Sequence, residues 1–304
     1  MSNKLPNFIV AGFPKCGTTS LFYYLTEHPE IYLPRQKELH FFSQHVLGHT
    51  HLEENKEFKK TYVRDIESYE KKYHEAKDEL AIGDVSPSYA VYPTSIPYIK
   101  KYLGENVKII ILVRDPVNRT FSNYLHAVRE YREKMEFYES LMDEPRRIKE
   151  NYADFLLYTK NSFYSANIKK YKESFNDVLV LTQEDLLRDT KGQLSMVYQF
   201  LNVQEGFIPK SLGTKFNEGG AFSDNFITRF ILKPNPLRTF ITKNIPMTST
   251  VKRFKRAILG KYRVDTPKLD SKSEKYLIEI FKEEVSELSN MGVNVSNWNQ
   301  QYFK

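Results

Sequence analysis

Short, mostly apolar runs recur along the chain, and each is followed by a segment whose apolar residues have helical spacing. The runs cover 8–13, 80–85, 107–113 and 178–181. Nearly continuous apolar runs are typical of strands buried on both faces of a parallel sheet. The segments that predict helices are 18–25, 95–103, 116–134, 162–174, 190–201 and 270–290. Alternating strands and helices predict an α/β fold of three layers, α/β/α, around a central parallel sheet.

No linker, internal repeat or low-complexity tract divides the 304 residues. We therefore expect one domain over 1–304, with a basic stretch at about 205–260 as an insertion. The charged region 53–79, which is interrupted by aromatic residues, predicts surface helices. The segment 37–42 (KELHFF) follows a short apolar stretch and is expected to be extended.

The stretch from Asn7 to Leu25 is organised as strand, tight loop and helix, with glycines and a proline ending the apolar run. Thr18 or Thr19 is available to cap the first helical turn. The loop 14–17 then lies where a strand's carboxyl end meets a helix's amino end, and the N–H groups and dipole there favour an anion. Lys15 adds a full positive charge to this loop.

This loop differs from the nucleotide triphosphatase motif G-x-x-x-x-G-K-[ST]. Gly12 and Gly17 have the motif's spacing, but Thr18 follows the second glycine and the lysine lies inside the loop. No hydroxyl follows a lysine to hold Mg²⁺, and the apolar run at 107–113 ends in Arg114 where a triphosphatase has a metal-binding Asp. The sequence thus predicts an anion loop that works without a metal.

Three blocks resemble the sulfotransferases that use 3′-phosphoadenosine 5′-phosphosulfate. Residues 14–21 (PKCGTTSL) resemble the phosphosulfate-binding loop of this family, and 110–124 is similar to its site for the 3′-phosphate. Residues 37–42 resemble the segment that carries the catalytic carboxylate in the branch acting on heparan-type glycans. The likeness runs from Phe8 to about Trp298, except near 205–260, and is closest to a bacterial-type soluble member of the heparan sulfate and carbohydrate branch.

The resemblance implies transfer of a sulfuryl group from 3′-phosphoadenosine 5′-phosphosulfate, without a metal, to a hydroxyl or amine of a carbohydrate or glycolipid acceptor. It implies that the loop neutralises charge on the 5′-phosphate, with Lys15 near the reacting bond. Arg114 and Ser122 would hold the 3′-phosphate; the alternative for Arg114 is an ion pair with Asp115. The implied cofactor-binding residues are Lys15, Cys16, Gly17, Thr18, Thr19, Ser20, Arg114 and Ser122, with Lys261 and Arg263 matched more loosely.

Two residues compete for the role of general base. Glu38 and His40 are two apart, so on an extended backbone they project to the same side. The resemblance favours Glu38, provided that nearby Tyr32, Phe41 and Phe42 raise its pKa. The reference pKa of histidine is closer to neutral, and some sulfotransferases use a histidine. The bland alternative for both residues is a charged, solvated turn.

The composition limits the cellular compartment in which we expect this protein. The single cysteine, Cys16, fits a reducing compartment and is expected to fill space in its loop. No apolar run approaches the ~20 residues of a membrane span, and 1–7 lacks the apolar core of a signal peptide. We therefore expect a cytoplasmic enzyme rather than a trimmed catalytic domain of an anchored one.

The net charge of +7 is concentrated in one segment. Residues 228–263 contain ten basic and no acidic residues, interleaved with apolar ones. A phosphorylated cofactor, an anionic glycan or the surface of an anionic membrane fits this segment. Since the chain has no nucleic-acid fold signature, we expect no nucleic acid partner.

Several alternatives are weighed against the sulfotransferase interpretation. A small-molecule kinase of P-loop type shares the loop geometry but needs the metal ligands that are missing. A non-catalytic nucleotide or polyanion binder has no use for Glu38. Val85 stands where the glycan branch has a lysine that meets an anionic glycan, which argues against a heparan-like acceptor. His45, His49 and His51 lack metal-ligand spacing and predict a surface loop.

Overall fold

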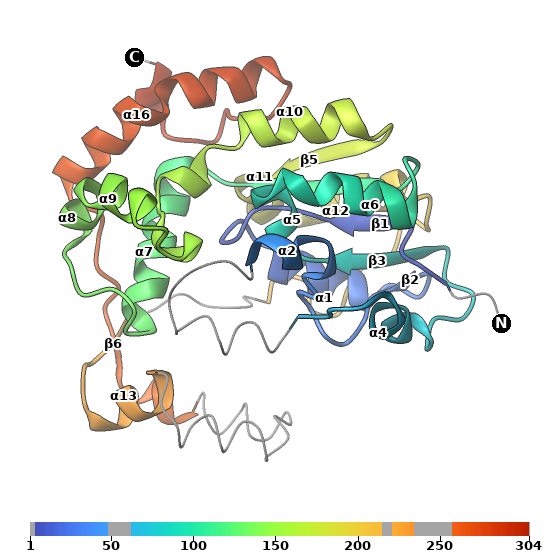
Figure 1. Cartoon of the computed structure of the whole chain (residues 1–304), viewed down its shortest axis with the longest axis horizontal. Coiled ribbons are helices and arrows are strands. Elements are labelled where there is room, and N and C mark those ends of the chain that lie inside the picture. Colours follow the sequence, from blue (N-terminus) through green and yellow to red (C-terminus); the bar gives the residue numbers. More distant parts are fainter. Residues whose placement is uncertain (1–3, 48–61, 215–220, 234–256, 304) are drawn as a thin grey trace.

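A central sheet of five parallel strands organises the computed structural model, which describes residues 4–47, 62–214, 221–233 and 257–303 (Figure 1). The strand order is β2-β3-β1-β4-β5, with parallel pairing throughout. The strands are β1 (Phe8–Val10), β2 (Ile31–Tyr32), β3 (Ala81–Val85), β4 (Lys108–Val113) and β5 (Val178–Thr182). Because β1 lies in the middle, the loop after it emerges between the ends of β3 and β4.

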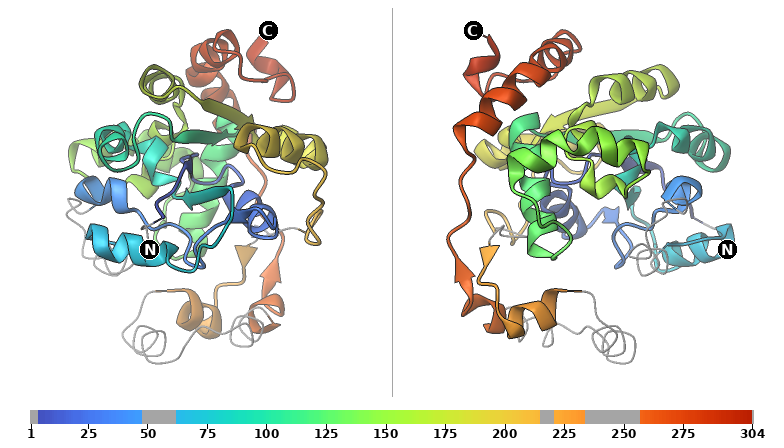
Figure 2. Two further views of the ribbon diagram at one scale, coloured as in Figure 1. Left: turned by 90° about the vertical axis from the view of Figure 1, so that its right-hand side faces the viewer. Right: turned by 60° about the vertical axis from the view of Figure 1, so that its left-hand side comes forward.

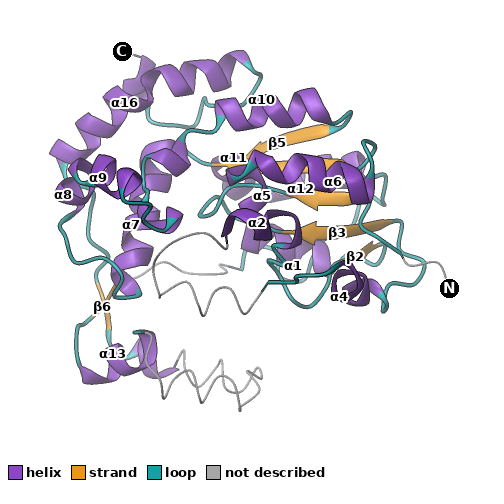
Figure 3. Ribbon diagram, viewed as in Figure 1, coloured by secondary structure: helices purple, strands orange, loops and turns teal. Residues whose placement is uncertain are grey.

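Helices cover both faces of this sheet (Figure 2). α1 (Thr18–Thr26) and α12 (Thr190–Leu201) lie on one face, and α6 (Ile96–Leu103) and α10 (Ser165–Ser174) on the other. Figure 3 shows the strands enclosed by helices, which confirms the predicted three-layer α/β/α fold. The other helices are α2 (Gln44–Leu47), α4 (Ile66–Glu70), α5 (Ser88–Val91), α7 (Pro116–Arg129), α8 (Phe137–Met142), α9 (Glu144–Lys149), α11 (Gln183–Arg188), α13 (Phe226–Leu232) and α16 (Ser271–Asn290).

Two glycines let the central strands approach closely. A Cβ at Gly83 would lie 2.2 Å from the ring of Phe8, and a Cβ at Gly12 would lie 2.6 Å from the backbone nitrogen of Leu112. Neither distance is compatible with a side chain, so β1 packs against its neighbours only because these positions are glycine. This packing fixes where the loop after β1 begins.

Two local predictions were wrong, and a third, surface helices in 53–79, holds only in part: α4 and a 3₁₀ turn at 71–73 form there, but two of their rings are buried. The helix expected over 116–134 ends at Arg129. The segment 37–42 is not extended, since Glu38 and His40 have left-handed backbone angles and a 3₁₀ turn follows. Within the described part of 53–79, the rings of Tyr69 and Tyr73 are buried, because they pack on the aromatic cluster beside Phe41.

The C-terminal part adds a helix and a small ribbon to this core. α16 packs against α7 and α10, and the antiparallel pair β6 (Ala221–Phe222) and β7 (Arg263–Val264) contacts α7. α13 is joined to the end of α7 by a hydrogen bond of 3.1 Å between the hydroxyls of Tyr131 and Thr228. Among the described residues, no helix combines the length and apolar character needed to span a membrane.

Candidate active site

The loop 14–17 connects β1 to α1 in a conformation that leaves the helix end open. Gly17 occupies the cap position with φ 94°, and no side chain caps the first turn. The prediction that Thr18 or Thr19 caps the helix was therefore wrong, because the left-handed glycine makes the turn without them. The backbone N–H of Phe13 donates to the carbonyl of Leu112 at 2.9 Å, which ties the loop to the end of β4.

Two guanidinium groups hold the loop by its carbonyls. Arg114 Nη1 lies 3.4 Å from the carbonyl oxygen of Lys15, and Arg119 Nε lies 3.2 Å from that of Pro14. Arg119 is fully buried and was not predicted from the sequence. The alternative ion pair between Arg114 and Asp115 does not occur in the described structure, because the Asp115 carboxylate caps α7 and accepts from the backbone N–H of Asn299.

Positive charge accumulates around the Lys15 ammonium. Burial, followed by the charges of Arg129, Arg119 and Arg114, lowers the pKa of Lys15 from 10.5 to about 8. Glu130 opposes this shift only weakly, as the smallest of the causes. A group whose pKa is lowered by several like charges gains free energy when an anion neutralises them. These charges make the loop a candidate anion site.

The remaining loop residues fit this description. Cys16 is fully buried, and burial raises the pKa of its thiol to about 12, so it fills space as predicted. Thr19, Ser20 and Ser122 are partly exposed, and within the described chain their hydroxyls make no hydrogen bond to protein groups. These three hydroxyls remain free to donate to a ligand.

Glu38 and His40 meet, although the segment that carries them is not a strand. The backbone N–H of Glu38 donates to the carbonyl of Val85 at the end of β3, at 3.0 Å. Left-handed angles at both residues then bring Glu38 Oε2 to 3.8 Å from His40 Nε2. His40 Nδ1 is held 2.7 Å from Ser88 Oγ. The predicted proximity is confirmed, but by turn geometry rather than by strand alternation.

Lys37 joins the loop to this segment and was missed as a site residue. Its Nζ lies 2.5 Å from Glu38 Oε1 and 3.4 Å from Thr18 Oγ1. Burial raises the pKa of Glu38, but the Lys37 ammonium and its hydrogen bond, with smaller contributions from His40 and Lys15, together outweigh burial, and the pKa lies below its ordinary value. The expectation that an apolar setting raises this pKa was therefore wrong. Burial lowers the pKa of His40 to about 4, so His40 is neutral at pH 7.

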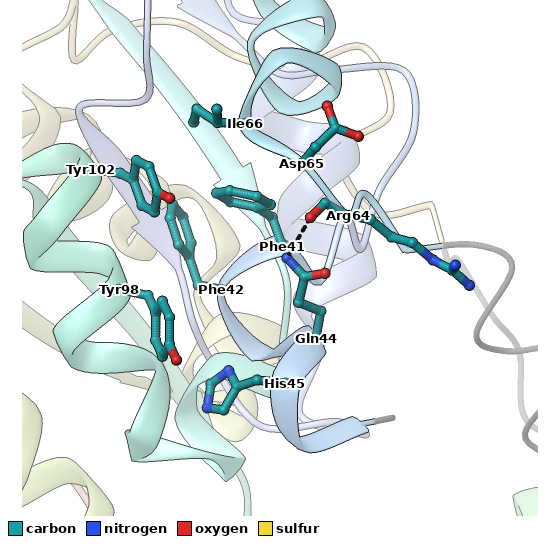
Figure 4. Close-up of a pocket in the computed structure, with 9 residues that line it drawn as sticks. All are labelled: Phe41, Phe42, Gln44, His45, Arg64, Asp65, Ile66, Tyr98 and Tyr102. Carbon is teal, nitrogen blue, oxygen red and sulfur yellow. Dashed lines mark hydrogen bonds between the residues drawn. The ribbon is translucent and has the colours of Figure 1, made fainter. Parts of the chain in front are cut away.

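The aromatic residues expected around Glu38 line a different space. Phe41 and Phe42 point into a cavity of about 300 Å³ between α2, α4 and α6 (Figure 4). Phe41 stacks on Tyr69 at 4.5 Å between ring centroids. The cavity is lined by Phe41, Phe42, Gln44, His45, Arg64, Asp65, Ile66, Tyr98 and Tyr102. Because these rings line another cavity, the strongest lowering influence on the Glu38 carboxylate is Lys37, and the pKa of Glu38 is lowered rather than raised.

A buried carboxylate supports the segment from below. Asp84 accepts hydrogen bonds from Ser86 Oγ at 2.7 Å, Tyr89 OH at 2.8 Å and Tyr69 OH at 3.0 Å. Ser86 Oγ in turn accepts from the backbone N–H of His40 at 3.3 Å. Burial raises the pKa of Asp84. The only sequence signal was an aspartate at the end of an otherwise apolar strand.

Gln183 approaches the loop from the end of β5. A Cβ placed on Gly17 would lie 3.4 Å from Gln183 Cγ, and Gln183 Oε1 is buried without a hydrogen-bond partner in the described structure. Glu184 accepts from the backbone N–H of Asp115 at 3.2 Å. In parallel sheets ligands bind beyond the strand carboxyl ends. A polar residue directly after an apolar strand was the signal that could have identified Gln183.

Other predicted residues lie elsewhere or remain untested. Lys261 lies in the turn before β7 and Arg263 begins β7, which pairs with β6 beside α7, and their binding role stays a prediction. His45 Nε2 lies 3.2 Å from Thr94 Oγ1, and His49 and His51 fall outside the described residues. Within the described ranges, no three metal-ligating side chains cluster.

The geometry agrees with comparisons to known proteins. The profile described as "Sulfotransferase family" matches residues 6–206, about two thirds of the chain. The chain therefore belongs to the sulfotransferase family, a family of enzymes. It superposes on a crystal structure of a sulfotransferase from Alicyclobacillus acidocaldarius with a TM-score of 0.73 and 25% identity, over 99% of this chain and 100% of that one.

Curated relatives share parts of the sequence. The chain is 35% identical over 128 residues to the membrane-associated sulfotransferase kil1 of Dictyostelium discoideum, which covers 41% of this chain and 24% of the relative. It is 24% identical over 260 residues to human carbohydrate sulfotransferase 15, covering 68% of this chain and 46% of the relative. The chain thus spans less than half the length of either relative.

Proposed function

We propose that this protein transfers a sulfuryl group from 3′-phosphoadenosine 5′-phosphosulfate to a hydroxyl or amine of a carbohydrate or glycolipid acceptor. One observation carries the proposal: a loop whose cations form no ion pair among the described residues lies beside a carboxylate whose pKa is lowered. The charge of Lys15 contributes to lowering the pKa of Glu38, so the two groups lie close enough to interact electrostatically. An anion loop alone fits a binding protein, whereas the adjacent carboxylate adds a proton acceptor.

Each group has a role in this reaction. The donor supplies a sulfuryl group whose S–O bond to the 5′-phosphate breaks as the acceptor oxygen or nitrogen forms the new bond to sulfur. Glu38 takes the proton from the acceptor, and Lys15 with the open end of α1 stabilises the charge left on the phosphate. Arg114 and Ser122 hold the 3′-phosphate, and the hydroxyls of Thr19 and Ser20 complete the loop.

His40 is assigned to positioning. Its pKa of about 4 makes it a weak base, and its Nδ1 is committed to Ser88. If Ser88 donates to Nδ1, the proton of neutral His40 lies on Nε2, the nitrogen that faces Glu38 at 3.8 Å. His40 then orients the carboxylate. This assignment favours Glu38 as the base over His40.

Ligand binding separates this function from a kinase. We expect 3′-phosphoadenosine 5′-phosphate to bind tightly in EDTA and ATP to bind weakly, as measured by calorimetry. The matched control is adenosine 5′-phosphate, which lacks the 3′-phosphate and should bind less tightly because Arg114 and Ser122 have no partner. Better binding of ATP, or a strict Mg²⁺ requirement, contradicts the sulfotransferase proposal and supports the small-molecule kinase.

The acceptor class rests on the carbohydrate sulfotransferase among the relatives. Val85, in place of a lysine, is buried at the end of β3, so this position offers no charge to an anionic glycan. Neutral sugars and glycolipids are therefore expected to be better acceptors than heparan-like chains. A screen with isotopically labelled donor tests this, and transfer to heparan fragments alone contradicts it.

Contact with an anionic membrane is the second part of the proposal. On α13, Phe226 is 82% exposed and its ring stacks with that of Phe230. Lys233 directly after the helix supplies positive charge, whereas Arg229 is paired with Asp224 at 2.5 Å. A relative is named as membrane-associated. Sedimentation with phosphatidylserine vesicles should show binding at low salt that Phe226→Ser weakens. No sedimentation of the intact protein at low salt contradicts membrane contact.

A further inference from the structure

One face of α7 continues past the residues that the proposed function uses. Arg119, Ser122, His126 and Arg129 are spaced by three, four and three residues, so their side chains lie on one side of the helix. Arg119 contacts the loop through the carbonyl of Pro14 at 3.2 Å. This face therefore borders the anion site, and His126 and Arg129 extend it by two turns beyond Ser122.

Arg129 is held by a neutral partner. Its Nη2 donates to His126 Nδ1 at 2.6 Å. His126 Nδ1 is thus the acceptor, and the ring proton lies on Nε2, 3.6 Å from Glu130 Oε1. No carboxylate lies within ion-pair distance of Arg129 in the described structure, whereas Arg132 pairs with Glu130 at 3.2 Å. A neutral acceptor orients the guanidinium of Arg129 without cancelling its charge.

Arg129 and Lys15 lie close enough for their charges to interact. After burial, the charge of Arg129 is the largest contribution to the lowered pKa of Lys15, ahead of Arg119 and Arg114. Burial, then Lys15, Arg129 and Arg132, lower the pKa of His126 to about 3, which keeps its ring neutral at any working pH. Glu130 acts on both cations in the opposite direction, but it pairs with Arg132 at 3.2 Å. Lys15 and Arg129 therefore still form a place for oxyanions.

We propose that Arg129 binds the sulfuryl group of the donor beside Lys15, and that His126 is a positioning residue that holds the guanidinium. The inference rests on the proposed function, in which Lys15 neutralises the 5′-phosphate and Arg114 with Ser122 holds the 3′-phosphate. The sulfuryl oxygens are the donor's remaining anionic group and adjoin the 5′-phosphate. A planar guanidinium presents parallel N–H groups to two such oxygens.

Two ligands that differ only in the sulfuryl group test the inference. In Arg129→Gln, calorimetry should show the affinity for 3′-phosphoadenosine 5′-phosphate within about twofold of the parent protein. The affinity for the phosphosulfate should fall about tenfold or more, and kcat about 10²-fold or more, as for loss of one oxyanion donor. Added guanidinium should partly restore transfer by Arg129→Ala. Lys134→Gln removes an exposed charge from the segment after α7 and should leave both affinities unchanged.

Variants of His126 test its positioning role separately. His126→Phe should reproduce the selective loss of phosphosulfate affinity to a smaller degree, and His126→Gln, whose amide oxygen accepts from Arg129, should retain more. An equal loss for both ligands in Arg129→Gln overturns the inference, as does unchanged phosphosulfate binding with a raised KM for the acceptor. If the parent protein binds neither ligand, the proposed function itself fails.

Discussion

Two regions near the same edge of the sheet, the loop 14–17 after β1 and the segment 37–40 after β2, differ in whether their charged side chains are paired. Around the loop, burial and the charges of Arg129, Arg119 and Arg114 lower the pKa of Lys15 to about 8, and among the described residues no ion pair joins these cations to a carboxylate. In the segment, Lys37, Glu38 and His40 are linked to one another at 2.5 and 3.8 Å. The loop is ready for a ligand, whereas the segment is internally satisfied.

This difference indicates what ligand binding must change. The loop stabilises an anion without rearrangement, which is the preorganised electrostatic contribution to catalysis. Glu38 has to exchange its hydrogen bond to Lys37 for one to the acceptor before it takes a proton. Lys37 already lies 3.4 Å from Thr18 Oγ1, so its ammonium can turn toward a ligand in the loop. We therefore expect Lys37 to couple donor binding to release of Glu38.

The largest expected effect comes from removing the base. Glu38→Gln keeps the shape but not the proton acceptor, so kcat should fall about 10²–10⁴-fold while the affinity for 3′-phosphoadenosine 5′-phosphate stays nearly unchanged. His40→Ala is the comparison and should lower kcat less. Steady-state kinetics decide between them, and an active Glu38→Gln beside an inactive His40→Ala would make His40 the base.

The next effect concerns the loop. Lys15→Gln should lower kcat about 10²–10³-fold and also weaken binding of the bisphosphate product. Because the pKa of free Lys15 is about 8 and a bound anion raises it, binding takes up a proton above that pH. Affinity of the parent protein should therefore fall as pH rises from 8 to 10, and that of Lys15→Gln should not. Calorimetry in buffers of different ionisation enthalpy counts the protons, and no uptake at pH 9 contradicts the assignment.

A smaller effect tests the link between the two regions. Lys37→Met removes the ammonium that lowers the pKa of Glu38, so this pKa should rise. The acidic limb of kcat/KM reports the free enzyme's base and should move to higher pH, with about a tenfold loss at neutral pH. An unchanged acidic limb would show that Lys37 does not control Glu38. Lys134→Gln serves as the control for a general loss of charge.

The smallest expected effect on turnover comes from replacing Asp84, the buried carboxylate that supports the segment 37–40 through Ser86. Asp84→Asn replaces a carboxylate that accepts from three hydroxyls, so at least one buried donor loses its partner. Unfolding free energy should fall by about 1–3 kcal/mol, measured by denaturant titration. Transfer should decline only a few-fold, because Asp84 reaches the site through Ser86. A loss of turnover as large as that of Glu38→Gln, in a stable variant, would show that Asp84 acts more directly.

Sequence reasoning placed a side chain correctly where its position follows from its own strand or helix. Arg114 follows β4 directly and Lys15 lies between β1 and α1, so strand ends placed both at one edge of the sheet. It missed Arg119 and Gln183, whose contacts involve groups distant in the chain, and Lys37, whose contact with Glu38 depends on the conformation of the turn. It also assigned Phe41 and Phe42 to Glu38, because sequence proximity does not reveal which way a turn directs a side chain.

The sequence by itself determined the order of strands and helices, the anion loop and the pair Glu38 and His40, because apolar periodicity, glycine spacing and local motifs are properties of neighbouring residues. Only the tertiary structure decided which charges are paired. The pKa of Glu38 lies below its ordinary value because Lys37 turns toward it. That of Lys15 is lowered because the fold buries it and brings Arg129, Arg119 and Arg114 around it. Electrostatic interaction depends on distance in space, which the fold sets.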